Sequence, residues 1–134
     1  MDAQLNDYPA LVARACDIAF AAGELISKFA AANENVPFRT KGDLSPVTDA
    51  DEAANALIIR ELANLTHPIP IIAEESFTFG EALPLSTNTF WLVDPLDGSK
   101  EFINGIDEYT VNIALIVENT PELGVVYLPA LGIL

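Results

Sequence analysis

The chain contains few residues that react through sulfur or imidazole: one cysteine, Cys16, and one histidine, His67, among 134 residues. A single cysteine cannot form an intramolecular disulfide, and Cys16 lies in an apolar helical pattern, where a small buried thiol is common. We therefore expect Cys16 in the core. One histidine, placed before a proline in a predicted loop, supports neither a histidine-based metal site nor a Ser-His-Asp triad.

Basic residues are also scarce, with six lysines and arginines against twenty acidic residues and a formal net charge of −14. This charge repels the phosphate backbone, which excludes a nucleic-acid polymer as partner. It also repels a small phosphorylated ligand unless cations lie between the ligand and the protein. A phosphate site in this chain must therefore bind metal first. Most of the carboxylates have a simpler role as surface charge.

Long uninterrupted apolar runs are missing. The N-terminus carries Asp2 and Asp7 instead of a basic region, and the most apolar stretch is interrupted by Asp17 and Glu24. We therefore expect no export signal, no transmembrane segment and a cytoplasmic location. Hydrophobic residues nevertheless make up 51% of the chain, which predicts one folded domain with a core.

Two segments of the first half predict amphipathic helices. From Pro9 to Phe29, apolar residues recur every three or four positions. A second helix is predicted after Thr48, a capping residue, and runs to about Leu65. Its first turn is acidic, which suits the helix dipole, and this alone would explain Asp51 structurally.

Apolar runs in the second half predict strands at Ile69–Ala73, Phe90–Val93 and Tyr109–Val117. The last of these and Gly124–Leu128 flank a loop-like segment, so we expect them to form an antiparallel hairpin. Two helices followed by several strands predict an α+β fold, with the helices packed on a largely antiparallel sheet.

Acidic residues follow two of these predicted strands. Glu74 and Glu75 follow the first run, Asp94 follows the second, and Asp97 comes three residues later in Asp-Pro-Leu-Asp-Gly. A carboxylate beside a buried strand costs desolvation free energy unless it is neutralised, and hard oxygen ligands suit Mg²⁺. The pattern indicates a cation site at the strand ends.

The Asp-Pro-Leu-Asp-Gly segment can direct both of its acids to one ion. Pro95 holds Asp94 extended, and Gly98 lets the chain turn sharply after Asp97. The carbonyl of Leu96, outside strand pairing, would be a further oxygen ligand. Two cations held by shared carboxylates would clamp a phosphate and activate a water.

Other interpretations of this segment stay open. The same five residues also form plain turns between strands. Glu74 at another strand end supports a site, as do Asp51 and Ser99, a carboxylate and a hydroxyl suited to orienting a water. Paired carboxylates also catalyse glycoside hydrolysis, which needs one protonated acid, whereas several acids together favour metal.

In order and spacing, four segments resemble the inositol monophosphatase superfamily. They are KGDLSPVTDAD from Lys41 to Asp51, IAEES from Ile72, WLVDPLDGSKEF from Trp91 to Phe102, and TVNIALI from Thr110. The Lys-Glu-Phe ending and the TVNIALI strand most resemble its CysQ branch, the 3'(2'),5'-bisphosphate nucleotidases. The resemblance covers only the N-terminal part of a complete family member.

The resemblance implies roles for individual residues. Metal ligands would be Glu74, Asp94, the carbonyl of Leu96 and Asp97. Asp51 and Ser99 would orient the attacking water. Apart from the resemblance, Glu75 is a further catalytic candidate, as a base close to the site, or a simple neighbour of it. The substrate would contact Lys41, Glu74, Leu96, Asp97, Gly98 and Ser99. Family members usually have threonine at Ser99, and serine lacks the methyl group that restricts its rotamer, so weaker orientation is expected.

As a function, the resemblance implies a Mg²⁺-dependent phosphatase that converts 3'-phosphoadenosine 5'-phosphate to AMP, in sulfur assimilation and nucleotide recycling. An inositol monophosphatase or another sugar phosphatase is the alternative enzyme. The family's last aspartate ligand and its base- or sugar-recognising segment lie in a C-terminal half that we expect to be absent here. A third possibility is a non-catalytic metal-binding remnant that pairs with itself or with a missing half, suggested by the apolar end Leu131–Leu134.

Overall fold

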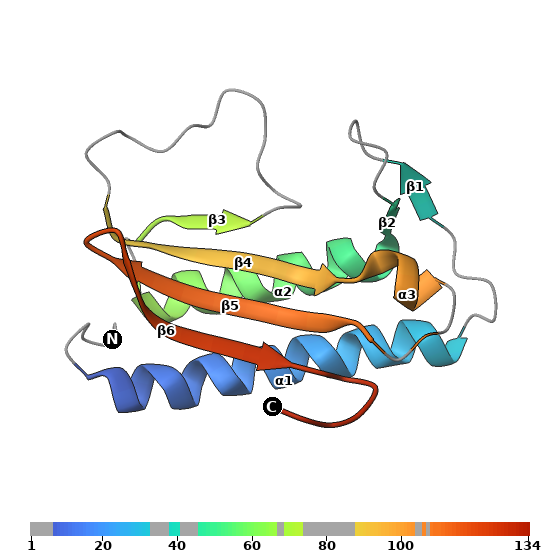
Figure 1. Ribbon diagram of the computed structural model, residues 1–134, viewed down its shortest axis with the longest axis horizontal. Helices are drawn as coiled ribbons and strands as arrows, with labels where there is room; N and C mark the ends of the chain where they lie inside the picture. The colour runs from blue at the N-terminus through green and yellow to red at the C-terminus, as the bar shows by residue number, and fades with distance from the viewer. Residues whose placement is uncertain are drawn as a thin grey trace.

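A computed structural model describes residues 7–32, 38–40, 46–66, 69–73, 88–103, 106 and 108–134 of the chain (Figure 1). The helices are α1 (Tyr8–Ala32), α2 (Asp49–Thr66) and α3 (Ser99–Ile103). The strands are β1 (Phe38–Thr40), β2 (Pro46–Thr48), β3 (Ile71–Ala73), β4 (Phe90–Asp97), β5 (Thr110–Val117) and β6 (Thr120–Tyr127). His67, expected in a loop, lies outside the described residues.

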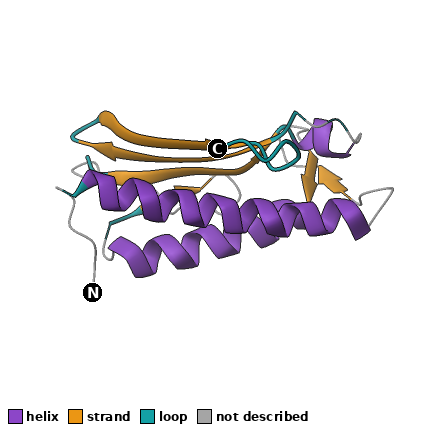
Figure 2. Cartoon of the chain, turned by 90° about the horizontal axis from the view of Figure 1, so that it is seen from below, coloured by secondary structure: helices purple, strands orange, loops and turns teal. Residues whose placement is uncertain are grey.

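Four strands form one sheet in the order β3-β4-β5-β6, and β1 and β2 form a separate antiparallel pair. Within the large sheet β3 runs parallel to β4, and the other two pairs are antiparallel. Helices α1 and α2 lie together on one face of this sheet, as Figure 2 shows from the side. The predicted α+β fold with a largely antiparallel sheet is confirmed. Within the described residues, no helix combines the length and apolarity needed to cross a bilayer.

Helix α2 begins at Asp49, directly after Thr48, and ends at Thr66, within one residue of the prediction. Its acidic first turn is present, but Asp51 is 0% exposed and lies on the buried side of the helix with Ala54 and Ile58. Dipole compensation at a solvated helix end therefore does not explain Asp51. The burial of this carboxylate needs another explanation, because removing a charged group from water costs free energy.

The core lies between the two long helices and the large sheet. Residues alternate along β5 and β6: Val111, Ile113 and Leu115 are buried against the helices, and the residues between them are more exposed. Trp91, Phe102 and Tyr109 are all buried, and the last two form an edge-to-face pair with ring centroids 5.1 Å apart. Burial of one such large side chain contributes about 1.5–3 kcal/mol. Cys16 is half-buried and packs against this core.

Strands β5 and β6 form the predicted hairpin, but its turn is shorter than the sequence indicated. Only Glu118 and Asn119 connect the strands, with φ angles of 50° and 62°, as a two-residue type I′ turn requires. Strand β6 therefore begins at Thr120 and not at Gly124. Pro121 suggested a loop, yet it lies in the edge strand, where a missing backbone donor is tolerated.

Strand β4 continues through Pro95 to Asp97, so the prediction that it ends at Val93 was wrong. The proline is accommodated because the pairing of β4 with β5 is irregular between Asp94 and Asp97. The segment is thus neither a strand end at Asp94 nor a plain turn between strands.

Candidate functional site

A bulge in β4 brings Asp94 and Asp97 to the same face of the sheet. Asp94 lies opposite Asn112 and Asp97 opposite Thr110, so three steps along β4 match two along β5. In a regular strand, residues three apart point to opposite faces. Asn112 and Thr110 are two apart and share a face, and directly opposed residues lie on the same side. The two acids therefore share a face because of the extra residue in the strand.

The shared face is the one turned away from α1 and α2, which we call the open face of the sheet. Asp94 is half-buried there and Asp97 is exposed. Between them the side chain of Leu96 is only 3% exposed and belongs to the hydrophobic core. The bulge is thus anchored in the core through Leu96, while the carboxylates face outward. Coordination by the Leu96 carbonyl stays a prediction.

Gly98 fixes the turn that follows Asp97. Its φ angle is +96°, and an added Cβ would lie 3.0 Å from the carbonyl oxygen of Glu108 and 3.3 Å from the Cα of Tyr109. Only glycine fits both the dihedral angle and the space. The Gly98 carbonyl accepts a hydrogen bond from the backbone N–H of Phe102 at 2.9 Å, which closes the first turn of α3.

The turn is close to negative charge. The position of an added Gly98 Cβ is 3.2 Å from the Glu101 carboxylate oxygen Oε2. The predicted phosphate-binding turn, Asp97 to Ser99, therefore begins with one carboxylate, that of Asp97, and is followed by a second, that of Glu101. Ser99 is the first residue of α3, and its side chain lies outside the described residues.

Asp51 approaches from the helical layer. Figure 1 shows the start of α2, the C-terminal end of β4 and α3 at the same end of the molecule, and β2 contacts both α2 and α3. The structure thus places buried Asp51 at the end of the sheet where Asp94 and Asp97 lie.

Within the described ranges, no three acidic, histidine or cysteine residues come together closely enough to hold a metal ion. Asp51, Asp94 and Asp97 alone therefore do not form the predicted cluster. The remaining predicted residues, Lys41, Glu74 and Glu75, lie outside the described residues.

The pairing of β3 with β4 bears on this cluster. Ala73, the last residue of β3, lies opposite Val93, the residue before Asp94, and the two strands are parallel. Carboxyl ends of adjacent parallel strands meet at one edge of a sheet, which is a common place for binding sites. Carboxylates on the open face supply hard oxygen atoms, so the chemistry of the described donors suits Mg²⁺.

The sequence motifs did not predict that Asn112 would be a neighbour of the two acids. It lies opposite Asp94, and its Nδ2 donates a hydrogen bond to Oγ1 of Thr110 at 2.9 Å. The sequence did contain a signal for this role, because Asn112 is a polar residue within a strand that is otherwise rich in Val and Ile. The two polar residues continue the hydrophilic end of the open face from β4 onto β5.

Comparisons with known proteins identify the fold and the family. The sequence profile of the inositol monophosphatase family matches residues 8–134. The 3'(2'),5'-bisphosphate nucleotidase CysQ of Escherichia coli (strain K12) is 42% identical over 119 residues, which cover 89% of this chain and 48% of the relative. CysQ of Buchnera aphidicola is 39% identical over 129 residues, 96% of this chain and 48% of the relative. The chain thus spans about half the length of these curated relatives.

Solved structures agree with the sequence matches. The extragenic suppressor protein suhB from Bartonella henselae superposes with a TM-score of 0.81 at 28% identity, over 92% of this chain and 46% of that one. CysQ from Bacteroides thetaiotaomicron has a TM-score of 0.68 at 36% identity, over 90% and 42% of the two chains. These matches confirm the predicted resemblance, including its CysQ-like character, and the chain belongs to the inositol monophosphatase family.

Proposed function

We propose that this chain is the N-terminal, metal-binding part of a Mg²⁺-dependent phosphatase that removes the 3'-phosphate of 3'-phosphoadenosine 5'-phosphate to give AMP. The observation that carries the proposal is the β4 bulge, which directs Asp94 and Asp97 to one face beside the Gly98 turn. Membership of the family supports a phosphatase, and the names of the CysQ relatives support the nucleotide substrate.

Asp94, Asp97, the carbonyl of Leu96 and Glu74 would hold the metal. When bound, Mg²⁺ supplies the positive charge that offsets the phosphate and the activation of a water for attack. Asp94 and Asp97 contribute formal negative charge on the same face, which is the main attraction for the cation.

Asp51 and Ser99 would position the attacking water. A buried carboxylate accepts hydrogen bonds in a low-dielectric setting, where such bonds orient a partner strongly. Asp51 is fully buried at the first turn of α2, so its carboxylate has little freedom to move. The hydroxyl of Ser99 would share this task, and Glu75 would be a further acid or base.

The turn from Asp97 to Ser99 would receive the substrate phosphate, with Lys41 as a counter-charge. Gly98 has a φ of +96°, which a glycine adopts without strain, so the chain can turn sharply here and direct its backbone toward a phosphate. Glu101 and the chain's net charge of −14 oppose the approach of a bare phosphate. Substrate binding should therefore depend strictly on prior metal binding.

The setting that follows from this activity is sulfur assimilation and nucleotide recycling in the cytoplasm. The base-recognising part of such a site would belong to the other half of the family fold, because the chain spans about half the length of its relatives.

The test is phosphate release by the purified chain from 3'-phosphoadenosine 5'-phosphate and from inositol 1-phosphate, each with Mg²⁺ and with EDTA. We expect faster release from the nucleotide, and loss of release with EDTA. Faster turnover of inositol phosphate would instead identify an inositol monophosphatase. Magnesium binding without hydrolysis of either compound would identify a metal-binding remnant that needs a further part of the fold.

A further inference from the structure

The polar side chains that are buried in the described part of the chain all lie on α2: they are Asp51, Asn55 and Thr66. The hydroxyl of Thr66 is paired, because it donates to the carbonyl of Leu62 and accepts from the indole of Trp91. Oδ1 of Asn55 differs: among the described residues it has no hydrogen-bond donor, although Asn55 is only 7% exposed. A buried acceptor without a donor costs free energy, so its presence in the core points to a partner such as a water.

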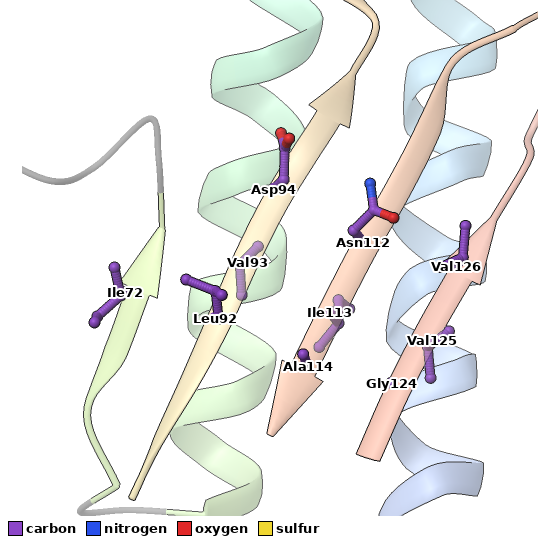
Figure 3. Close-up of a pocket in the computed structure, with 10 residues that line it drawn as sticks. All are labelled: Ile72, Leu92, Val93, Asp94, Asn112, Ile113, Ala114, Gly124, Val125 and Val126. Atoms are coloured by element: carbon purple, nitrogen blue, oxygen red, sulfur yellow. The ribbon is translucent and has the colours of Figure 1, made fainter. Parts of the chain in front are cut away.

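Asn55 faces β4, as Thr66 does. Asn55 precedes Thr66 by about three turns of α2, and at about 3.6 residues a turn the two side chains differ in direction by roughly 20°. Thr66 faces β4 because it bonds Trp91, so Asn55 points to the same strand. Figure 3 shows α2 behind β4, the strand that carries Asp94 at the edge of a groove on the open face.

The same spacing places Asn55 at the level of the β4 bulge. Three helical turns rise by roughly 16 Å, a length that about five strand residues cover. α2 and β4 run in opposite directions, because the last turn of α2 bonds the start of β4 and the start of α2 lies at the other end of that strand (Figure 1). From Trp91 this length reaches Leu96, whose side chain belongs to the core. Asn55 therefore lies beneath the bulge that directs Asp94 and Asp97 to one face.

Asp51 lies one turn before Asn55 and is 0% exposed. Side chains four residues apart on a helix have Cβ atoms about 5–6 Å apart. An ionised carboxylate and an amide oxygen are both acceptors, so these two groups cannot bond each other directly. A water has two O–H groups, and each of them reaches an acceptor oxygen at about 2.8 Å. One water therefore spans the distance between Asp51 and Oδ1 of Asn55.

We propose that Asn55 is a positioning residue for Asp51: in the metal-loaded site, one water donates hydrogen bonds to Oδ1 of Asn55 and to the Asp51 carboxylate. This inference rests on the proposed function, in which Asp51 orients the attacking water. A carboxylate orients a water well only if its own direction is fixed, and hydrogen bonds from neighbouring groups fix it. Because Oδ1 gains its donor on loading, Asn55 disfavours the metal-free fold and favours the metal-bound one.

The test compares Mg²⁺ affinity with stability in the 134-residue chain and in two variants, Asn55→Leu and Thr66→Val. Each substitution replaces a buried polar side chain on the same side of α2 with an apolar one and leaves the net charge unchanged. Isothermal titration calorimetry measures the affinity, and urea unfolding in EDTA measures the stability. A change in affinity can therefore not arise from a change in overall charge.

Asn55→Leu should weaken Mg²⁺ binding about tenfold, because loss of a hydrogen-bond partner around a metal site typically costs about 10–100-fold in affinity. Its stability in EDTA should equal or exceed that of the wild type, since an unpaired acceptor is removed. Thr66→Val should show the opposite pattern, with lower stability and unchanged affinity, because it removes the acceptor of Trp91 three turns away from Asn55. A purely structural role of Asn55 would change stability and leave the affinity unchanged.

Asn55→Ala takes the place of the leucine variant if that protein fails to fold by circular dichroism, and it should also weaken binding about tenfold. Equal affinity of the wild type and a folded Asn55 variant would overturn the proposal and leave the proposed function intact. An equal loss of affinity in Thr66→Val would also overturn it, because the effect would then follow the stability of the core. Absence of Mg²⁺ binding by the wild type would contradict the proposed function, and this inference with it.

Discussion

The indole Nε1–H of Trp91 donates a hydrogen bond to Oγ1 of Thr66 at 2.7 Å, and both side chains are buried. The same Thr66 hydroxyl donates to the carbonyl of Leu62 at 3.2 Å. The two bonds connect the last turn of α2 to the first part of β4. They satisfy the indole donor inside the core, where an unpaired N–H would be costly.

Thr66→Val should lower the free energy of unfolding by about 1–3 kcal/mol, because it leaves the Trp91 donor buried without an acceptor. Thr66→Ser keeps the hydroxyl and should cost less. Urea unfolding of the three proteins measures the difference. Equal stability of the valine and serine variants would show that the hydrogen bond contributes nothing net.

Gly98→Ala should destabilise the chain by more than about 1 kcal/mol, because φ is +96° and an added Cβ meets the Glu108 carbonyl at 3.0 Å. Gly132→Ala is the control: its φ is also positive, at +65°, but an added Cβ has no atom within 4 Å. The difference between the two midpoints of thermal unfolding reports the close approach at Gly98. An equal loss in both would attribute the effect to the dihedral angle alone.

Asp94→Asn should weaken Mg²⁺ binding at least tenfold, about 1.4 kcal/mol, because it removes one of the two carboxylates that share the open face. Isothermal titration calorimetry measures the affinity. Glu122→Gln removes the same charge from an exposed position of β6 and should leave the affinity nearly unchanged. Similar losses in both variants would indicate general attraction to an acidic chain and not a site.

Asn55 lies one turn after Asp51 on the buried side of α2 and is 7% exposed. Among the described residues, its Oδ1 finds no hydrogen-bond donor. Asn55→Leu should therefore keep or raise the free energy of unfolding, by up to about 1–3 kcal/mol, since it removes a buried polar atom without a partner. Chemical unfolding checks this prediction. A clear loss of stability would mean that the amide has a partner in solution, such as a bound water.

A substitution in the hairpin turn should raise the thermal stability of the chain. Glu118 has a φ of 50°, which costs a residue with a Cβ about 1–2 kcal/mol unless its side chain compensates. Asparagine tolerates this conformation better, so Glu118→Asn should raise the melting temperature. Glu122→Asn, in the adjoining strand, should not. A lower melting temperature for Glu118→Asn would contradict the type I′ assignment.

Local patterns were enough to predict much of this protein. The apolar period of α1, the hydroxyl before α2 and the Val- and Ile-rich strands depend on neighbours in the chain, and the structure confirms these elements. The motifs around Asp94 also predicted the family, which the comparisons confirm. Roles of Lys41, Glu74 and Glu75 stay predictions, because they lie outside the described residues.

The sequence by itself determined the two long helices, the strand-rich second half, the positions of the acidic residues along the chain, and the family that the chain resembles. Only the tertiary structure decided that β4 continues past Pro95, that Asp51 is fully buried, and that Asp94 and Asp97 share a face. It also decided that one side of the sheet presents an apolar groove. The physical reason is register: the face to which a strand residue points depends on its pairing with a distant strand, and one extra residue reverses it.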